Sequence, residues 1–246
     1  MERLRLTQKE KIDIIEHFKE EINNADKLSA INFDPKGFIN KIDEKNVIKP
    51  TLIIKPSVMY KMTALVDESD VEISWHGFVK RDKEKNVFFV YDIALFPQIN
   101  SAATTTTNQD KYAEWISKYI SDPESNFEDM RLHGHSHVNM SVYSSGIDTA
   151  YQEDLIKHTE DGDFYIFLIL NKKGDLCSLI YDFEQQILFK THEIAIKIMD
   201  KDTVDATTWA KEMIKEYCTT EKPESKWTKN RYWNNSNCTR KGVIKR

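Results

Sequence analysis

The sequence predicts an α/β protein in which a mixed β-sheet is sandwiched by helices. Two observations support this fold class. Segments rich in β-branched residues alternate with segments whose apolar residues recur at helical spacing, in the order strand, helix, strands, helix, strand, helix, strands. The run FYIFLIL at 164–170 is continuously apolar, which is typical of a strand buried on both faces of a sheet. With 246 residues, the chain can bury a substantial core without disulfides.

Residues 1–50 are predicted to form a helical N-terminal extension. Thr7 and Glu10 have the spacing of a capping box, and Ile12, Ile15, Phe18 and Ile22 follow at helical intervals. A helix over 8–24 is therefore expected. Packing against the rest of the protein and recruitment of a partner are both possible roles for this extension.

Residues 51–198 supply the elements of the sheet. In chain order they are a strand at 51–55, a helix starting at Pro56, strands within 71–79 and 86–97, a loop at 99–110 and an amphipathic helix at 111–120. Beyond the next strand and helix, 163–198 adds a buried strand and a hairpin. This order of elements is the pattern of a layered α/β domain.

Residues 131–150, RLHGHSHVNMSVYSSGIDTA, contain a candidate metal site. His135 and His137 are two apart in a predicted strand, so their side chains point to the same face about 7 Å apart. Ser145 and Asp148 are three apart at the start of a predicted helix, on one side of its first turn. Two imidazoles and a carboxylate leave one position open, as in a catalytic rather than a structural zinc site.

These residues resemble the metal-binding signature of the JAMM metalloproteases, also called MPN+, JAB-type or Mov34/PAD-1-like. The matching pattern is His135-Ser136-His137, seven residues, Ser145, two residues and Asp148. The family consists of zinc isopeptidases that cut ubiquitin and ubiquitin-like modifiers. The resemblance covers 51–198 and implies a JAMM/MPN catalytic domain of cytidine-deaminase-like architecture, with Zn²⁺ bound by His135, His137 and Asp148.

The resemblance also implies two catalytic residues. The family places a glutamate on a strand upstream of the histidines, shortly before a glycine, and Glu72 with Gly77 resembles that placement. Spacing alone does not separate Glu72 from Glu68 or Glu84. Glu72 would carry the proton from water to the leaving amine, and Ser145 would hydrogen-bond the carbonyl oxygen in the transition state. Because the metal needs neutral histidines, activity is expected to fall below about pH 6.

The expected function is hydrolysis of a peptide or isopeptide bond at the C-terminal tail of a ubiquitin-like modifier. The alternatives are a non-catalytic MPN-type scaffold and a phage-type JAB peptidase acting on tail or capsid proteins. Ser-x-x-Asp is also a common helix N-terminus pattern, and strand histidines are often ordinary hydrogen-bonded residues. Val138 stands where many family members have proline, and the segments that clamp ubiquitin in dedicated deubiquitinases look short.

Composition bounds the remaining possibilities. The net charge of −5 gives the chain as a whole no nucleic-acid footprint. No apolar stretch is long enough to span a membrane and the N-terminus lacks a signal core, so a cytoplasmic location without membrane contact is expected. The three cysteines are widely spaced, which indicates neither a disulfide framework nor a second zinc site.

Residues 199–246 predict a short helix followed by a basic, aromatic tail. From Ser225 onward the chain has seven Lys or Arg and no acid, and Trp227, Tyr232 and Trp233 are interleaved with them. This composition fits contact with single-stranded nucleic acid or with an acidic partner. A solvated tail whose aromatic residues pack back on the domain explains it equally well.

Overall fold

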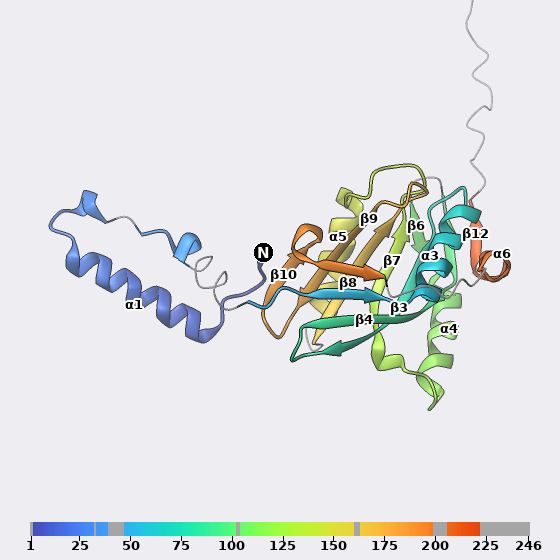
Figure 1. Ribbon diagram of the computed structural model, residues 1–246, viewed down its shortest axis with the longest axis horizontal. Helices are drawn as coiled ribbons and strands as arrows, with labels where there is room; N and C mark the ends of the chain where they lie inside the picture. Colours follow the sequence, from blue (N-terminus) through green and yellow to red (C-terminus); the bar gives the residue numbers. More distant parts are fainter. Residues whose placement is uncertain are drawn as a thin grey trace, which may run out of the picture.

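A nine-stranded mixed sheet forms the centre of the protein in the computed structural model (Figure 1). The structure describes residues 2–31, 33–38, 47–101, 104–159, 163–198 and 206–221. In spatial order the strands are β1 (Glu2–Arg3), β10 (Ile187–Lys190), β9 (Leu176–Asp182), β8 (Phe164–Leu170), β7 (Met130–Ser136), β3 (Ser74–Asp82), β4 (Val87–Leu95), β2 (Thr51–Ile54) and β11 (Ala195–Ile198). The pairs β7–β8, β2–β4 and β2–β11 are parallel and the others antiparallel, which confirms the mixed α/β class.

Helices cover both faces of this sheet, whereas the N-terminal helix α1 extends away from it (Figure 1). The bounds of the described helices are α1 (Gln8–Asn24), α3 (Pro56–Glu68), α4 (Gln109–Ser121), α5 (Gly146–Thr159) and α6 (Thr207–Tyr217), with 3-10 turns at Leu28–Ala30, Phe127–Asp129 and Thr191–Glu193. Helices α3 and α6 pack on one face, while α4 and α5 contribute to clusters on the other. None of the described helices has the length and apolar content needed to cross a membrane.

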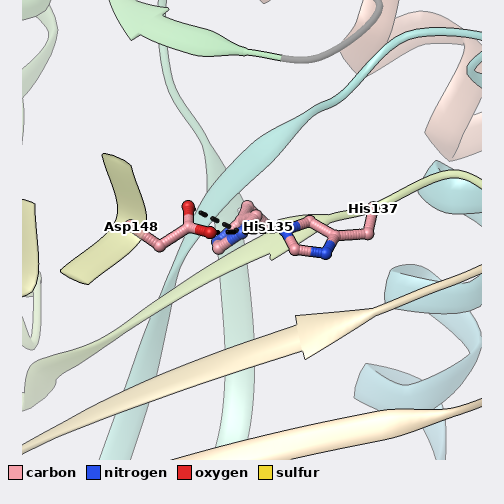
Figure 2. A group of neighbouring side chains, drawn as sticks. All are labelled: His135, His137 and Asp148. Carbon is pink, nitrogen blue, oxygen red and sulfur yellow. Dashed lines mark hydrogen bonds and ion pairs between the residues drawn. The ribbon is translucent and has the colours of Figure 1, made fainter. Parts of the chain in front are cut away.

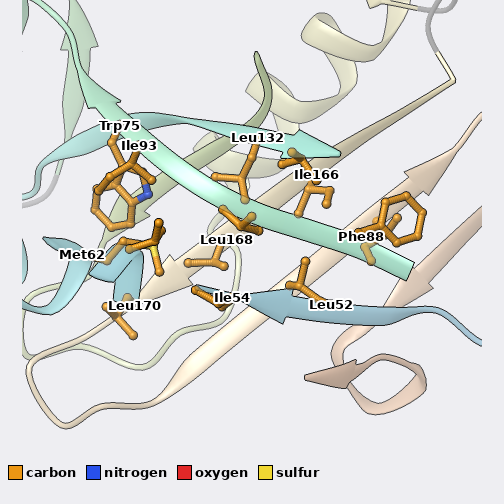
Figure 3. Close-up of a cluster of buried hydrophobic side chains, with 14 of the residues drawn as sticks. Leu52, Ile54, Met62, Trp75, Phe88, Ile93, Leu132, Ile166, Leu168 and Leu170 are labelled. Atoms are coloured by element: carbon orange, nitrogen blue, oxygen red, sulfur yellow. The ribbon is translucent and has the colours of Figure 1, made fainter. Parts of the chain in front are cut away.

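The core between the sheet and α3 follows from strand alternation. Ile166, Leu168 and Leu170 point toward α3, whereas Tyr165 and Phe167 point toward α5. Both sets are buried, so the run FYIFLIL is a strand covered on both faces, as predicted. Figure 3 shows the α3 side of this core, with the buried side chains Leu52, Ile54, Met62, Trp75, Phe88, Ile93, Leu132, Ile166, Leu168 and Leu170.

The predicted N-terminal helix is confirmed as α1, with both capping-box hydrogen bonds between Thr7 and Glu10. The preceding residues were not predicted to join the sheet, yet β1 pairs with β10 at its edge. At the other end of the chain, the predicted short helix is α6, and Trp209 and Met213 pack against the core. The basic tail lies outside the described residues, and the division into three segments stays a prediction.

The prediction of a loop over 99–110 is wrong in part. A second, three-stranded sheet of order β12-β5-β6 contains β5 (Gln98–Asn100), β6 (Thr105–Thr107) and β12 (Cys218–Thr220). Strand β5 pairs with β6 in a hairpin and with β12, which comes from more than a hundred residues further along the chain. Polar composition hid these strands, because pairing with a distant segment leaves no local trace.

Candidate metal centre

Strand β7 is the central strand of the sheet, and His135 and His137 lie at its C-terminal end. It lies between β3 and β8, and Ser74 is paired with His135 across the β3 boundary. His137 follows the last strand residue, and its N–H donates to the carbonyl of Leu170 at 3.0 Å. The central position of β7 therefore fixes the main chain on which both histidines stand.

Gly134, between His133 and His135, is required by packing. A Cβ placed there would lie 2.2 Å from Nε1 of Trp75, closer than side chains tolerate. Trp75 is the residue paired with Gly134, and its indole is fully buried in the space that a side chain would need. The glycine lets the indole pack close against β7 on the face opposite His133 and His135.

The chain after His137 makes a turn that leads to α5. Val138 has a φ of 40°, a left-handed conformation that is strained for a β-branched residue. Proline fixes φ near −65° and does not fit this main chain. Hydrogen bonds hold the turn, with Lys172 N–H donating to the Val138 carbonyl at 2.7 Å and Asn171 donating to that of Met140 at 2.9 Å. The main-chain conformation at Val138 therefore excludes proline at this position.

His135, His137 and Asp148 come together at this point (Figure 2). The two Nε2 atoms are 3.0 Å apart, Asp148 Oδ1 is 3.2 Å from His135 Nε2, and Asp148 Oδ2 is 3.5 Å from His137 Nε2. Donor atoms bound to zinc at 2.0–2.2 Å in a tetrahedron lie about 3.3–3.6 Å apart. The separation of 3.5 Å lies within this range and those of 3.0 and 3.2 Å are slightly shorter, so the group could hold a metal ion after a small adjustment.

A hydrogen bond to the main chain orients His137. Nδ1 of His137 is 2.6 Å from the carbonyl of Ser141, so this nitrogen carries a proton and Nε2 presents its lone pair. A lone pair directed at the His135 imidazole and the Asp148 carboxylate needs a proton or a cation between them. The local chemistry thus fits a cation at the centre of the group.

The electrostatics of the group are consistent with this arrangement. Hydrogen bonding to Asp148 raises the pKa of His137 above 6.5, against the opposing effect of burial. Burial alone would raise the pKa of the Asp148 carboxyl, but the contacts with His135 and His137 hold it well below its usual range. The carboxylate is therefore ionised throughout the neutral range and available as a ligand.

Ser145 and Asp148 form the capping arrangement that was considered as an alternative to metal binding. Ser145 Oγ accepts from Asp148 N–H at 3.2 Å, and Asp148 Oδ2 accepts from Ser145 N–H at 2.6 Å. The same carboxylate faces both histidines, so capping and convergence on the histidines are compatible. The Ser145 hydroxyl is used here only as an acceptor, and its own proton remains available to a ligand in the cavity.

Glu72 lies beside this group in a cavity of about 1110 Å³. The prediction that Glu72 lies on a strand is wrong, because Glu72 precedes the first residue of β3 by two positions. The side chain is buried, and burial raises the pKa of its carboxyl against the lowering effect of His137 and His135. Glu68 instead pairs with Lys211 at 3.4 Å, and Glu84 lies in the turn between β3 and β4, so only Glu72 of the three candidates lines the cavity.

Apolar side chains and the edge strand β6 form much of the remaining wall. The lining includes Phe96, Tyr151 and Phe167, together with His133. Burial lowers the pKa of His133 well below 6.5, so this third histidine is neutral and stands outside the metal group. Strand β6 also lines the cavity and, within the described part of the chain, pairs with β5 alone, since it stands at the edge of its sheet.

No model of a known protein family matches the chain, and no curated protein matches it. Function is therefore inferred from the side chains that converge in this cavity.

Proposed function

We propose that the chain is a zinc-dependent metallopeptidase or isopeptidase of the JAMM (MPN+) type. The observation that carries this proposal is the convergence of His135, His137 and Asp148, whose donor atoms are 3.0 to 3.5 Å apart. Two imidazoles and one carboxylate are a donor set typical of catalytic zinc, with a position left for a reactant. A scaffold without activity would have no need for this donor set beside a buried carboxylate.

Glu72 is proposed as the general base and then the general acid. Zinc, when bound, supplies Lewis acidity that polarises a carbonyl group and makes a nearby water molecule more acidic. The Glu72 carboxylate takes the proton from the attacking water and delivers it to the departing nitrogen. Its raised pKa suits both transfers, because a more basic carboxylate accepts a proton more readily near neutrality.

Ser145 is proposed to stabilise the charge that develops on the carbonyl oxygen. Its hydroxyl lines the cavity, and the hydrogen bond from Asp148 N–H fixes the oxygen at the start of α5. The hydroxyl proton can therefore be donated to an oxyanion without rearrangement of the helix.

The proposed substrate is an extended chain, such as the C-terminal tail of a ubiquitin-like modifier joined to lysine or to another protein. Strand β6 lines the cavity and has no second strand partner among the described residues, and an extended peptide can add to such an edge through main-chain hydrogen bonds. A phage-type peptidase that processes tail or capsid proteins would use the same chemistry on another extended segment.

Metal analysis and a cleavage assay test the proposal together. The purified protein should contain one zinc per chain, and cleavage of a modifier fused through its tail to a second protein should stop with a chelator and return when zinc is added. Glu72→Gln should lower kcat at least about 100-fold without loss of zinc. Glu84→Gln, in the turn between β3 and β4, is the matched control and should behave as wild type. Cleavage that persists in chelator would exclude this mechanism.

A further inference from the structure

Residues 72–74 lead into β3 and place Glu72 in the cavity, but they have no partner strand on the β4 side. Regular pairing of β3 with β4 ends at Trp75 and Leu95, so the preceding three residues lack a β4 neighbour. Their peptide groups are nevertheless buried among β5 and β7. Buried main-chain N–H and C=O groups need partners, so their hydrogen bonds can be followed one by one.

All six main-chain polar groups of residues 72–74 are hydrogen-bonded. Ile73 is bonded twice to Ser136, with its N–H donating to Ser136 Oγ at 3.0 Å and its carbonyl accepting from Ser136 N–H at 2.9 Å. The Glu72 N–H donates to the carbonyl of Ser101 at 3.1 Å. The other three groups are bonded by two side chains of β5.

Gln98 and Asn100 supply these three bonds, and we call them the amide pair. Gln98 Oε1 accepts from Ser74 N–H at 2.8 Å, and Gln98 Nε2 donates to the Ser74 carbonyl at 2.8 Å. The side-chain amide of Gln98 thus makes the two hydrogen bonds to Ser74 that a peptide group of a neighbouring strand would make. Asn100 Nδ2 donates to the Glu72 carbonyl, and also to Gln98 Oε1 at 3.0 Å, which links the two amides.

The amide pair is itself rigidly held. Both side chains are almost completely buried, and β5 is fixed on its two sides by β6 and β12. By contrast, no hydrogen bond or ion pair within the described part of the chain joins the Glu72 carboxylate to another side chain. The position of that carboxylate therefore depends on the main chain that carries it.

We propose that Gln98 and Asn100 are positioning residues that hold Glu72 opposite the His135, His137 and Asp148 group. The inference rests on the proposed function, in which Glu72 transfers the proton. The amide pair does not touch the reacting atoms. It acts by fixing the peptide groups that directly follow the Glu72 side chain, through the Glu72 carbonyl and both main-chain groups of Ser74, so that the carboxylate keeps its distance from the metal ligands.

The test compares Gln98→Met with Asn86→Gly in the full chain. Methionine has the length of glutamine without its amide, so both bonds to Ser74 are lost with little change of volume. Asn86 is the matched control, because it is a buried amide that donates to a main-chain carbonyl, that of Ile48 at 2.6 Å, and it does not line the cavity. Its φ of 48° is one that glycine adopts readily.

Gln98→Met should keep bound zinc and a KM near the wild-type value, whereas kcat should fall about 100-fold, as expected for a misplaced general base. In a Glu72→Gln background the same substitution should lower kcat no further, because there is no base left to position. Amide hydrogen exchange at Ser74 should become at least about 10-fold faster, while Asn86→Gly leaves it unchanged.

Three results would overturn the inference: a wild-type kcat in Gln98→Met, an equal loss of kcat in both backgrounds, or unchanged exchange at Ser74. If Gln98→Met does not fold, Asn100→Ala is measured in the same kinetic cycle. A wild-type protein that binds no zinc and cleaves nothing would instead contradict the proposed function, and the exchange at Ser74 distinguishes this outcome because it does not depend on activity.

Discussion

Replacing Gly134 with alanine should disturb both the core and the candidate metal site. The new Cβ would lie 2.2 Å from Nε1, 2.4 Å from Cε2 and 2.8 Å from Cζ2 of Trp75. Real Cβ contacts are essentially never shorter than 3.0 Å, so either β7 or the indole has to move by at least about 0.8 Å. The indole is fully buried between the sheet and α3, which leaves the strand as the element that shifts.

Two magnitudes follow from this displacement. Overpacking of this kind costs about 1–3 kcal/mol of unfolding free energy. For a chain of this size that lowers Tm by about 2–12 °C. His135 is the next residue along the strand, and a shift of about 0.8 Å exceeds the roughly 0.2 Å tolerance of a metal bond. Zinc affinity should therefore fall about 10-fold to 100-fold.

A double-mutant cycle with Trp75→Leu separates the clash from other effects of alanine. Leucine lacks the three indole atoms that meet the Cβ, so Gly134→Ala should cost less than about 0.5 kcal/mol in the Trp75→Leu background. Urea unfolding gives the free energies, and competition with a zinc-binding dye gives the metal affinity. An equal cost of Gly134→Ala in the two backgrounds would refute the packing argument.

Three further outcomes are expected. Asp182→Ala should lower the unfolding free energy by about 3–5 kcal/mol in urea titrations, since it leaves Arg81 buried without the carboxylate that it contacts at 2.6 Å; a loss below about 1 kcal/mol would contradict this. Ser145→Ala should cost about 1 kcal/mol as a lost helix cap and about 100-fold in kcat, whereas Ser145→Thr should retain most of both. Asp148 raises the pKa of His137, so protonation of His137 stabilises the metal-free protein below pH 6.5. This stabilisation is lost as pH rises through the raised pKa of His137. Zinc binds better as His137 loses its proton. The increase in Tm on adding zinc should therefore grow between about pH 6 and pH 8, and an increase that shrinks with pH would show that protons do not compete with the metal at this site.

The local elements of this fold could be predicted because their signals lie within single segments. The capping box of α1 and the apolar run of β8 each specify a structure within a few neighbouring residues. The order of strands in the sheet and the pairing of β5 with β12 depend on contacts between distant segments. Nothing in a single sequence encodes such pairings locally, which is why β5 and β6 were predicted as loop.

The candidate site shows the same division. His135 and His137 could be placed on one face from their spacing, and Asp148 from its position in the first turn of the next helix. Gly134 had a signal that went unused, namely a glycine inside a strand, which often marks a close approach of other atoms. Gln98 gave no signal, because an amide that completes the hydrogen bonds of a distant strand looks like any polar residue.

Capping and ligand placement depend on the same pair of residues, which explains why the Ser-x-x-Asp pattern alone could not separate a structural role from a functional one. A free aspartate would have to lose rotamer freedom before it could join two histidines around a cation. Here the hydrogen bond from Ser145 N–H to Asp148 Oδ2 restricts the carboxylate as soon as α5 begins. This bond therefore contributes to a preorganised site, and loss of the bond should weaken metal binding even where the three ligands are unchanged.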